Sequence, residues 1–495
     1  MKKVVIVLPN QLFKKTEILS KRTKDRVFVV EHPLYFSMHP YHKLKLILHR
    51  ATMKMYHDYL KDEYEVQDIT YVDCREYNSF MENLRKHRSA ISMYDPVDHT
   101  IYKEFSELEV KYHTSPMFYC SRTDIEAYYS KSRNKFYQTD FYKWQRTRLG
   151  LMVDDKGNPW GGQWTFDEDN RKPFPKDFCL DAELAKNRSP YAEAAVSYVE
   201  KNFGYNIGST DFYLPVNYKE AELFLEDFLA NRFRLFGPYQ DAVSPEISIG
   251  AHSLLSPLLN IGLLTPRQVV DRTLEFYHAN KQQIPLQSLE GFVRQIVGWR
   301  EYIRMVYILE PIRLSESNYY NHSKKLSNAW YTGETGIPPV DDIIKKFVKL
   351  GYAHHIERLM YLGNLMFLLR TDPKEVYSYF MMFIDAYPWV MEANVFGMSQ
   401  HASGQLMMRK PYFSASNYVA KMSSYRKKKN SSSGKVCGRE WWEIWDALYY
   451  SFIYDNSQEL KKNYATARQV VHLNNKSQAE VKRLCELAEE YMNKY

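Results

Sequence analysis

Short apolar runs alternate with amphipathic segments over residues 3–120. Segments with helical periodicity lie at Tyr41–Leu60, Asn78–Lys86 and Lys103–Leu108. Because strands that alternate with helices usually pair in parallel, the pattern predicts an α/β, Rossmann-like domain over residues 1–125. The runs with the length of a buried strand are Val4–Leu8, Val27–Val30, Ile69–Val72, Ala90–Tyr94 and Met117–Tyr119.

The rest of the chain changes character twice. Residues 126–215 are mixed and include the turn-rich stretch 154–162 and the polar, aromatic run 163–172, which we interpret as an ordered connector between two domains. Residues 216–495 have helical periodicity and predict an all-α domain. Within it, Thr265, Pro266 and Gln268 form a capping-box signature, and Gly262 suits the end of the preceding helix.

Composition narrows the functional classes. The net charge of +8 favours a polyanionic partner over a polycation. The 41 Tyr and 9 Trp suit either core filling or a large aromatic cofactor with rings around it. No apolar stretch reaches the ~18 residues of a membrane span. The apolar run after Met1 is too short for a secretory signal. We expect a monomeric intracellular protein, cytoplasmic or nuclear, that is neither secreted nor bound to a membrane.

Three motifs suggest chemistry, each beside a plainer structural interpretation. Hydroxyls and free N–H groups in His252–Gly262 suit a diphosphate, although a capped buried helix explains them too. Glu290–Tyr302 is either a core helix with one ion pair or part of a cofactor pocket. His354 and His355, one turn before Arg358, are either core residues or a source of protons near pH 7. The missing G-x-G-x-x-G weighs against an ordinary dinucleotide enzyme.

The order of these motifs resembles the photolyase/cryptochrome superfamily, above all its bacterial branch with iron–sulfur (6-4) photolyases. That resemblance rests on T-S-x-L-S-P-x-L at 252–259, where His252 replaces Thr, on W-R-E-Y at 299–302 and on H-H at 354–355. The runs D-x₈-N at 385–394 and K-P-Y at 410–412 extend it. In the N-F-D-x-x-N-R-K run of this branch, Thr165 replaces the first Asn.

The resemblance implies an FAD cofactor and a UV-damaged DNA substrate. It implies that the first histidine of the pair faces the lesion and that His354 or His355 supplies a proton, with Tyr412 lining the lesion pocket. It makes Trp330 and Trp389 stations for photoreduction, and an Asn at flavin N5 favours the reduced anionic flavin. The implied FAD ligands are Tyr239, His252, Ser253, Leu255, Ser256, Trp299, Arg300, Asp385 and Asn394, and the implied DNA contacts are Arg171, Lys172, Lys410 and Arg426.

Two further cofactors of the branch are affected by substitutions. A lumazine or folate antenna would lie near Asn10 and Glu31, but the relatives have Asp where Asn10 stands. Arg426, Lys429 and Pro338 or Pro339 occupy the places of three cluster cysteines, which leaves Cys437 as the fourth. One thiolate cannot hold a [4Fe–4S] cluster, and the chain has no C-x-x-C. We expect neither the cluster nor any other metal.

The resemblance therefore predicts an α/β antenna-type domain followed by an all-helical FAD-binding domain. The expected activity is light-driven repair of (6-4) photoproducts, with electron transfer from reduced FAD. Repair of cyclobutane dimers remains open, since that reaction needs no acid. A blue-light sensor without repair and a dark flavin oxidoreductase are the alternatives from other classes.

Overall fold

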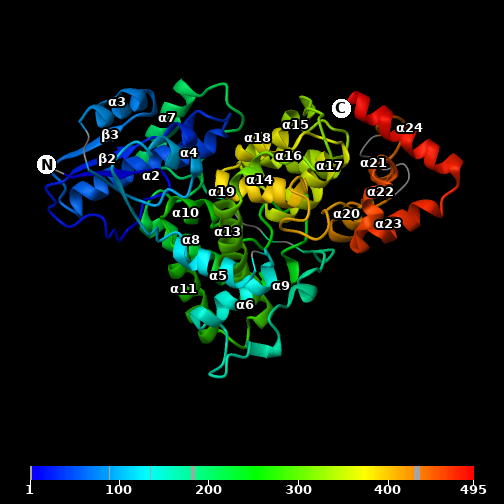
Figure 1. The fold of residues 1–495 in the computed structure, drawn as a ribbon, viewed down its shortest axis with the longest axis horizontal. Coiled ribbons are helices and arrows are strands. Elements are labelled where there is room, and N and C mark those ends of the chain that lie inside the picture. Colours follow the sequence, from blue (N-terminus) through cyan, green and yellow to red (C-terminus); the bar gives the residue numbers. More distant parts are fainter. Residues whose placement is uncertain (1–2, 88–89, 134, 179, 181–183, 428–434) are drawn as a thin grey trace.

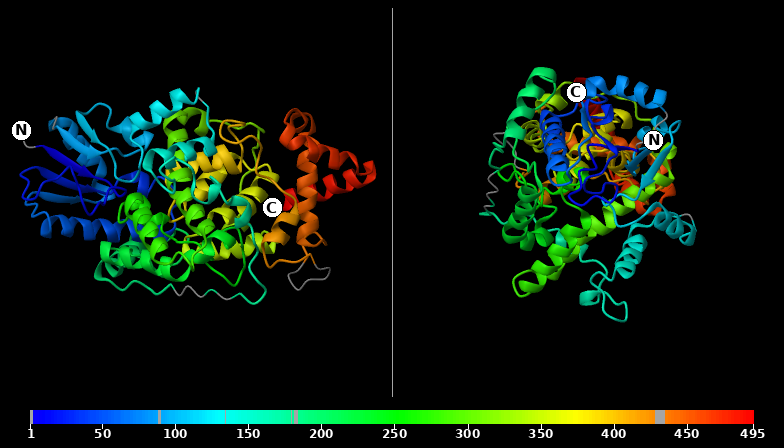
Figure 2. Two further views of the ribbon diagram at one scale, coloured as in Figure 1. Left: turned by 90° about the horizontal axis from the view of Figure 1, so that it is seen from below. Right: turned by 90° about the vertical axis from the view of Figure 1, so that its left-hand side faces the viewer.

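The computed structural model describes residues 3–87, 90–133, 135–178, 180, 184–427 and 435–495. Along its longest axis the molecule has three parts (Figure 1). An α/β part with the N-terminus lies at one end, a large helical part lies in the middle, and helices α21 (Trp441–Asp455) to α24 (Gln478–Lys494) lie at the other end. The left view in Figure 2 shows the same order, with the sheet far from the C-terminal helices.

A five-stranded parallel sheet in the order β3-β2-β1-β4-β5 forms the core of the α/β part. All residues of the strands β1 and β4 are buried. This burial explains their uninterrupted apolar runs, because helices cover both faces of a parallel sheet. The α/β class predicted from the sequence is confirmed. The strands are β1 (Val4–Val7), β2 (Arg26–Val30), β3 (Ile69–Val72), β4 (Ile91–Tyr94) and β5 (Val110–His113).

Two local predictions in this part are wrong. The fifth strand is β5, not Met117–Tyr119, and its half-buried sequence V-K-Y-H contains no apolar run because it is an edge strand. Met117–Tyr119 is apolar because it packs in the interior without strand pairing. The helix predicted at Lys103–Leu108 is instead α4 (His99–Glu104), which begins earlier because Asp98 caps it.

Helix α2 (Lys43–Asp62) connects the α/β part to the helical part. Its N-cap is His42, whose ring Nδ1 accepts from the N–H of Leu44. It packs along α7 (Pro190–Asn202), which belongs to the stretch predicted as a connector. That stretch is ordered where it is described, as expected, and it also holds α6 (Gln138–Leu149). The domain boundaries at 125/126 and 215/216 stay a prediction.

The remainder of the described chain is helical, which confirms the all-α prediction. The Thr265 capping box forms, and Gly262 ends its helix with φ 92°. Three helices contain π-helical turns, a feature that is frequent at functional sites. Those turns are η4 (Arg294–Arg300), η5 (Glu357–Gly363) and η6 (Ala393–Ser399).

The helices around these turns form the middle of the molecule and the C-terminal part. They are α8 (Tyr218–Asn231), α9 (Phe233–Tyr239), α10 (Ser256–Ile261), α11 (Pro266–Ala279), α12 (Leu286–Val293), α13 (Glu301–Leu309), α14 (Pro311–Ser315), α15 (Ala329–Thr332), α16 (Pro338–Leu350), α17 (Asn364–Leu368), α18 (Pro373–Met381), α19 (Pro388–Glu392), α20 (Ser416–Met422), α22 (Ser457–Lys462) and α23 (Tyr464–Asn474). The remaining short elements of the first half are α1 (Pro33–Phe36), η1 (Cys74–Glu76), α3 (Tyr77–His87), α5 (Arg122–Lys131), η2 (Trp160–Gly162) and η3 (Asp167–Asn170).

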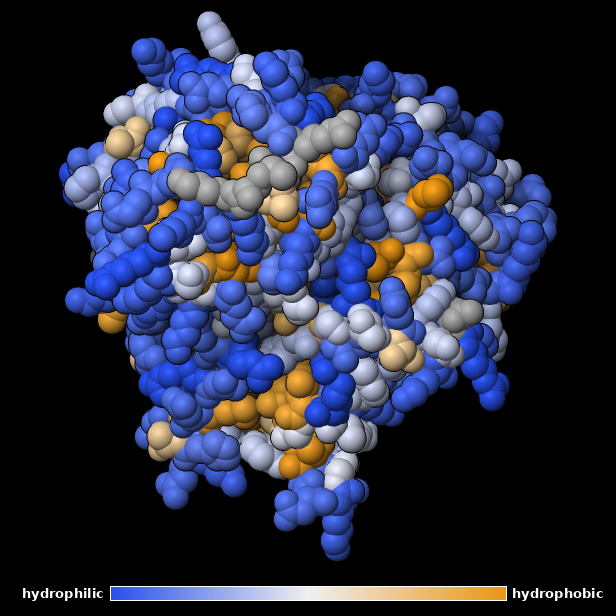
Figure 3. Space-filling model, turned by 60° about the vertical axis from the view of Figure 1, so that its left-hand side comes forward, coloured by the Kyte–Doolittle hydropathy of each residue, from blue (hydrophilic) through white to orange (hydrophobic). Residues whose placement is uncertain are grey.

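The surface is mostly polar. On the face in Figure 3, hydrophobic residues form small separate patches in a hydrophilic surround. Exposed large apolar side chains, such as Leu223 on α8 and Ile312 on α14, come from separate elements. No helix in the described ranges has the length and apolar character to cross a bilayer.

Candidate functional site

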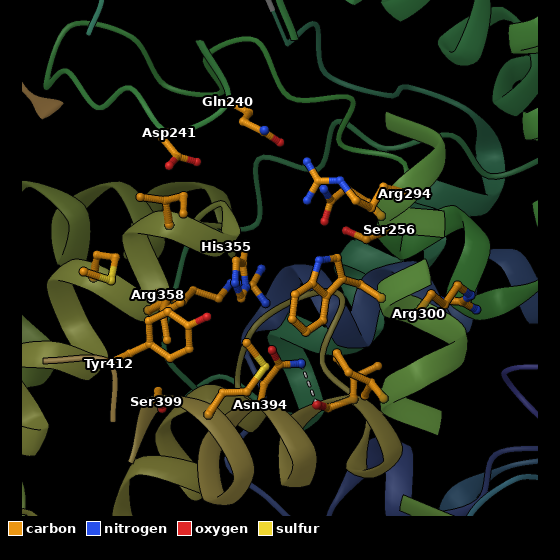
Figure 4. Close-up of a pocket in the computed structure, with 18 of the residues that line it drawn as sticks. Gln240, Asp241, Ser256, Arg294, Arg300, His355, Arg358, Asn394, Ser399 and Tyr412 are labelled. Atoms are coloured by element: carbon orange, nitrogen blue, oxygen red, sulfur yellow. Dashed lines mark hydrogen bonds between the residues drawn. The ribbon is translucent and has the colours of Figure 1, made fainter. Parts of the chain in front are cut away.

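A cavity of about 770 Å³ opens in the helical part. This volume lies within the range of about 300–1,000 Å³ that is usual for cofactor and ligand sites. Its walls come from α10, the three π-helical turns, α19 and the connector run 164–171. In Figure 4, Gln240 and Asp241 lie on one side, Asn394 and Ser399 lie on the opposite side, and His355 lies between them.

The carboxylate of Asp385 organises one wall of the cavity. Its Oδ1 accepts from Nη2 of Arg358 at 2.7 Å, and its Oδ2 accepts from Oγ of Ser256 at 2.7 Å. Its main-chain carbonyl accepts from Nδ2 of Asn260 at 2.8 Å. Arg300 in turn donates to Oδ1 of Asn260. The sequence placed Ser256, Arg300 and Asp385 at a cofactor site, and the structure brings all three together.

The segment before α10 supplies more of this wall. Ser253 and Leu255 line the cavity, and Oγ of Ser253 accepts from the N–H of Leu255 at 3.3 Å. Leu254 between them has a left-handed backbone with φ 57°, which costs a non-glycine residue about 1–2 kcal/mol. Such strain persists only where the surroundings impose it, often at binding sites. Helix α10 has only six residues. The serine side chains, more than a helix dipole, would therefore bind an anionic group at this wall.

The two adjacent histidines have different surroundings. His355 is exposed to the cavity, whereas His354 is 3% exposed and does not line it. His354 stacks on His252 with ring centroids 4.3 Å apart, and its N–H donates to Oε2 of Glu357 at 3.0 Å. The resemblance implied that the first histidine faces the lesion. In the structure the second one lines the cavity, and His354 is buried against His252 and Glu357.

Burial and positive neighbours hold both imidazoles neutral. The enclosing walls and the charge of Arg358 lower the pKa of His355 to about 4. Burial, then the nearby His252 and Lys346, lower the pKa of His354 well below its usual value. Solvent reaches the His355 ring through the cavity. A ligand that fills the cavity would therefore change the surroundings of this ring and, with them, its pKa. His252, whose Nε2–H donates to the carbonyl of Gln240 at 2.8 Å, also lines the cavity.

The opening of the cavity carries mixed charge. Arg171 and Arg294 both pair with the carboxylate of Asp167, Arg294 at 3.1 Å. Burial, then repulsion from Asp167, raises the pKa of Asp241 to about 6. Tyr412 and Lys410 line the same region. Two predicted DNA contacts, Arg171 and Lys410, and the predicted lesion contact Tyr412 are therefore at this opening.

The predicted flavin-facing residues also line the cavity. Nδ2 of Asn394 donates to the carbonyl of Val390 at 2.8 Å, which leaves its Oδ1 without a hydrogen bond inside the described chain. Trp299 and Trp389 form part of the lining. The guanidinium of Arg300 lies 4.7 Å from the Trp389 ring centroid. Nε1 of Trp389 has no hydrogen-bond partner among the described residues.

Trp330 lies behind the wall. It is 1% exposed and does not line the cavity. Its ring contacts Tyr379, with centroids 6.3 Å apart, and Tyr379 contacts Phe380 at 6.0 Å. Phe380 lines the cavity, while Tyr331, 5.7 Å from Tyr379, is 38% exposed. A continuous row of rings therefore connects the cavity to the surface through Tyr379.

Three other predicted site residues are not part of the cavity lining. Tyr239 packs on Phe174 and Phe178 instead. Lys172 is exposed and uses its main-chain N–H to reach the carbonyl of Pro238. Arg426 is exposed and donates to the carbonyls of Ala420 and Ser423. Its basic neighbours Lys428 and Lys429 lie outside the described residues.

The two predicted antenna residues are already engaged. Oε1 of Glu31 accepts from Arg50 at 2.7 Å and from Tyr71 at 2.5 Å, and Oε2 accepts from the N–H of Cys74 at 3.0 Å. Asn10 is fully buried and donates to the carbonyl of Pro96. Oδ1 of Asn10 is buried and has no hydrogen-bond partner among the described residues. An antenna at these two residues stays a prediction.

No cluster of His, Cys, Asp or Glu in the described part of the chain could hold a metal ion. Cys74, Cys120, Cys437 and Cys485 are free thiols, and Cys179 lies outside the described residues. Pro338 and Pro339 begin helix α16. The expectation that the iron–sulfur cluster is absent stays a prediction.

Several cavity residues were not singled out from the sequence. Asn260 and Arg294 lie inside the motifs 252–262 and 290–302, but no role was predicted for either, and none was predicted for Gln240 or Ser399. Their role depends on elements far apart in the chain that meet at the cavity. Burial of unpaired polar atoms, such as Nη2 of Arg294, is visible only once the fold is known.

Comparison with known proteins gives a consistent result. Residues 5–213 match the family model "Deoxyribodipyrimidine photo-lyase-related protein", and residues 292–433 match "FAD binding domain of DNA photolyase". The chain is 29% identical over 493 residues to a (6-4) photolyase of Agrobacterium fabrum, covering 94% of each. Its fold is similar to a bacterial class III photolyase from Agrobacterium tumefaciens (TM-score 0.53, 16% identity, 85% and 86% covered) and to a Synechocystis cryptochrome (0.56, 12%, 85% and 86%).

Proposed function

Because the chain belongs to the photolyase/cryptochrome superfamily, we propose that it is a light-driven DNA photolyase that binds FAD and repairs (6-4) photoproducts. The observation that carries the lesion type is the imidazole of His355, exposed to the cavity beside Arg358 and close to the opening with Tyr412. A cyclobutane dimer needs no acid at this place, whereas the (6-4) reaction does.

The residues present fit FAD. The cavity has the necessary size, the hydroxyls of Ser253 and Ser256, and the fixed Arg358–Asp385 pair. Asn394 presents an unbonded amide oxygen there, and Arg294 and Trp389 contribute buried donors without partners in the described chain. The expected FAD contacts are these groups with Trp299 and Arg300. Bound reduced FAD would supply the light-driven electron for repair.

His355 would move the proton. At neutral pH its imidazole is uncharged in the free protein, because its pKa is lowered to about 4. The phosphate charge of a DNA lesion that enters the cavity would raise that pKa again. The protonated ring then donates to the lesion and takes the proton back after the displaced group has returned to its base. Tyr412 and Lys410, at the opening, would position the flipped dinucleotide and its phosphate.

Photoreduction would use the row of rings behind the cavity wall. Trp330 remains a proposed station, reached through Tyr379 and Phe380. Trp389 lines the cavity itself and is instead suited to hold the cofactor. Tyr379 is the residue that the sequence interpretation missed.

The direct test is repair of two synthetic oligonucleotides, one with a single (6-4) lesion and one with a single cyclobutane dimer. Each is incubated with the FAD-loaded protein under blue light with reductant, and in the dark. Light-dependent loss of the (6-4) lesion alone supports the proposal. Loss of the dimer alone reassigns the lesion and makes the histidines structural. Turnover of neither lesion by a protein that holds FAD overturns repair in favour of a light sensor.

A further inference from the structure

Lys45 is a buried ammonium ion outside the cavity, and the activity described so far does not use it. Its side chain belongs to α2 of the α/β part and is 1% exposed. A charge with so little solvent costs several kcal/mol unless it is paired or hydrogen-bonded. The contacts of Lys45 show which groups compensate for the solvent that its amine has lost.

The ammonium binds both ends of one loop. Nζ of Lys45 donates to the carbonyl of Met381 at 3.1 Å and to that of Ala386 at 2.5 Å. Met381 ends helix α18, where carbonyls lack helical partners and attract a cation. Ala386 lies two residues before α19 begins at Pro388. Between these two carbonyls lies Asp385, the carboxylate that organises the cavity wall.

The contact is part of a seam along one face of α2. His42, Lys45 and His49 are spaced three and four residues apart and so share a face. The N–H of His42 donates to the carbonyl of Met382 at 3.2 Å. Nε2 of His49 is 2.7 Å from the hydroxyl of Tyr387. All three residues therefore hydrogen-bond to the loop 381–387, which is more than 330 residues away in sequence.

Aromatic rings enclose the ammonium. Nζ lies 4.2 Å from the ring centroid of Tyr41 and 5.4 Å from that of Tyr387, which is within the range of cation–π attraction. Burial lowers the pKa of Lys45 well below its usual value, and attraction to Asp385 opposes that change. The Lys45 amine thus donates to the loop beside the Arg358–Asp385 pair without touching the cavity.

We propose that Lys45 is a positioning residue for the cofactor: its ammonium clamps the two ends of the loop 382–386 and so fixes the Asp385 carboxylate between Arg358 and Ser256. The inference rests on the proposed binding of FAD. It assigns to the α/β part a role in shaping the cavity that is independent of any antenna. The clamp acts through Asp385, because Lys45, Ala386 and Tyr387 do not line the cavity.

The test is a Lys45→Met variant, which keeps the length of the side chain and removes the charge and its hydrogen bonds. We expect the FAD dissociation constant to rise by about 10-fold, which corresponds to a loss of about 1.4 kcal/mol of binding free energy. The matched control is Lys61→Met, an exposed lysine on the same helix, which should bind FAD as the unchanged protein does. Circular dichroism of each apoprotein reports folding separately.

A double-mutant cycle separates the clamp from a general packing effect. Ser256→Ala removes one of the two side-chain hydrogen bonds to the Asp385 carboxylate, which Lys45 positions through the loop. The effects of Lys45→Met and Ser256→Ala on FAD affinity should therefore be non-additive. The pair Lys61→Met and Ser256→Ala should be additive. If Lys45→Met does not fold, Lys45→Gln is used instead, since its shorter amide cannot bridge the carbonyls of Met381 and Ala386 as the amine does; the same outcomes are expected of it.

The outcomes separate the two proposals. If the unchanged protein does not bind FAD, the proposed function fails. If it binds FAD and Lys45→Met binds equally well, or if the cycle with Ser256→Ala is additive, the clamp is overturned while the proposed function stands.

Discussion

At the residue scale, the site depends on two neighbouring histidines whose environments differ. His355 has the cavity in front of it, and His354 is buried against His252. We predict that His355→Ala lowers the rate of (6-4) repair by about 10²–10⁴-fold, the usual contribution of a positioned acid, and leaves bound FAD in place. His354→Ala should weaken FAD retention instead, because it removes the ring that supports His252. Lesion turnover under light and the absorbance of bound flavin distinguish these effects.

The acid role also predicts a pH dependence. Since the pKa of His355 is lowered to about 4 in the free protein, the protonated fraction falls as pH rises above that value. Repair at lesion concentrations well below saturation reports the free enzyme, so its rate should fall as pH rises from 6 to 8. The slope should vanish in His355→Ala. A flat profile in the unchanged protein would contradict proton donation by this residue.

At the scale of elements, the row of rings from Phe380 through Tyr379 to Trp330 predicts a kinetic effect. Trp330→Phe and Tyr379→Phe should each slow light-driven reduction of bound flavin, because a phenylalanine ring is much harder to oxidise; Phe380 would only bridge Tyr379 and the cavity and would not itself be oxidised. Repair by protein that has been reduced chemically should be unchanged. The control is Trp441→Phe on α21, a buried Trp that does not line the cavity. Equal photoreduction rates in all variants would exclude this path.

The connector predicts a stability effect. The guanidinium of Arg146 on α6 is 1% exposed and donates to the carbonyls of Leu151, Met152 and Trp164 at 3.2, 2.6 and 2.9 Å. This contact holds the run that carries Asp167 and Arg171 to the cavity opening. Arg146→Met leaves three carbonyls without their donor, and we expect a loss of roughly 2–4 kcal/mol of stability. Urea unfolding measures it, and proteolysis should cut the connector faster; an exposed Arg148→Met variant is the comparison.

These elements show what the sequence could predict. Apolar runs located β1, β2 and β4, because a buried parallel strand must be apolar on both faces. Of the two edge strands, β3 was located because it still carries Ile69 and Val72, whereas β5, with the sequence V-K-Y-H, was missed. Motifs located Ser256, Asp385 and the histidine pair. They could not show which of the two histidines faces the cavity, or that Lys45 bonds to the loop of Asp385, because those contacts arise where distant segments meet.

At the scale of the whole molecule, buried neutral histidines should set the acid limit of stability. His42, His49, His322, His354 and His401 are all less than 5% exposed, and burial lowers the pKa of each. The unfolded chain takes up protons at these side chains below its pKa of about 6.5, whereas the folded protein does not. Stability is therefore complete above that pH and is lost as pH falls toward 4.

Carboxyl groups with a raised pKa change the stability of the fold in the opposite direction, and they do so over a different pH range. Burial raises the pKa of Asp98 to about 6 and that of Glu392 to about 8. These groups bind protons in the folded state that the unfolded chain has released, so they lower stability as pH rises. Such carboxyls, Asp241 included, oppose the five histidines below pH 6.5, and Glu392 still acts above it. The balance predicts a maximum of stability near neutral pH.

The measurement is the thermal midpoint of the apoprotein from pH 8 to pH 4.5. We expect a shallow change above pH 6.5 and a steep fall below it, with each histidine contributing up to ~1.4 kcal/mol per pH unit between its two pKa values. His322→Gln, which removes a titrating ring remote from the cavity, should make the fall less steep without changing FAD binding. An exposed His472→Gln variant should leave the curve unchanged. A midpoint independent of pH across this range would mean that the buried rings do not remain neutral in the folded protein.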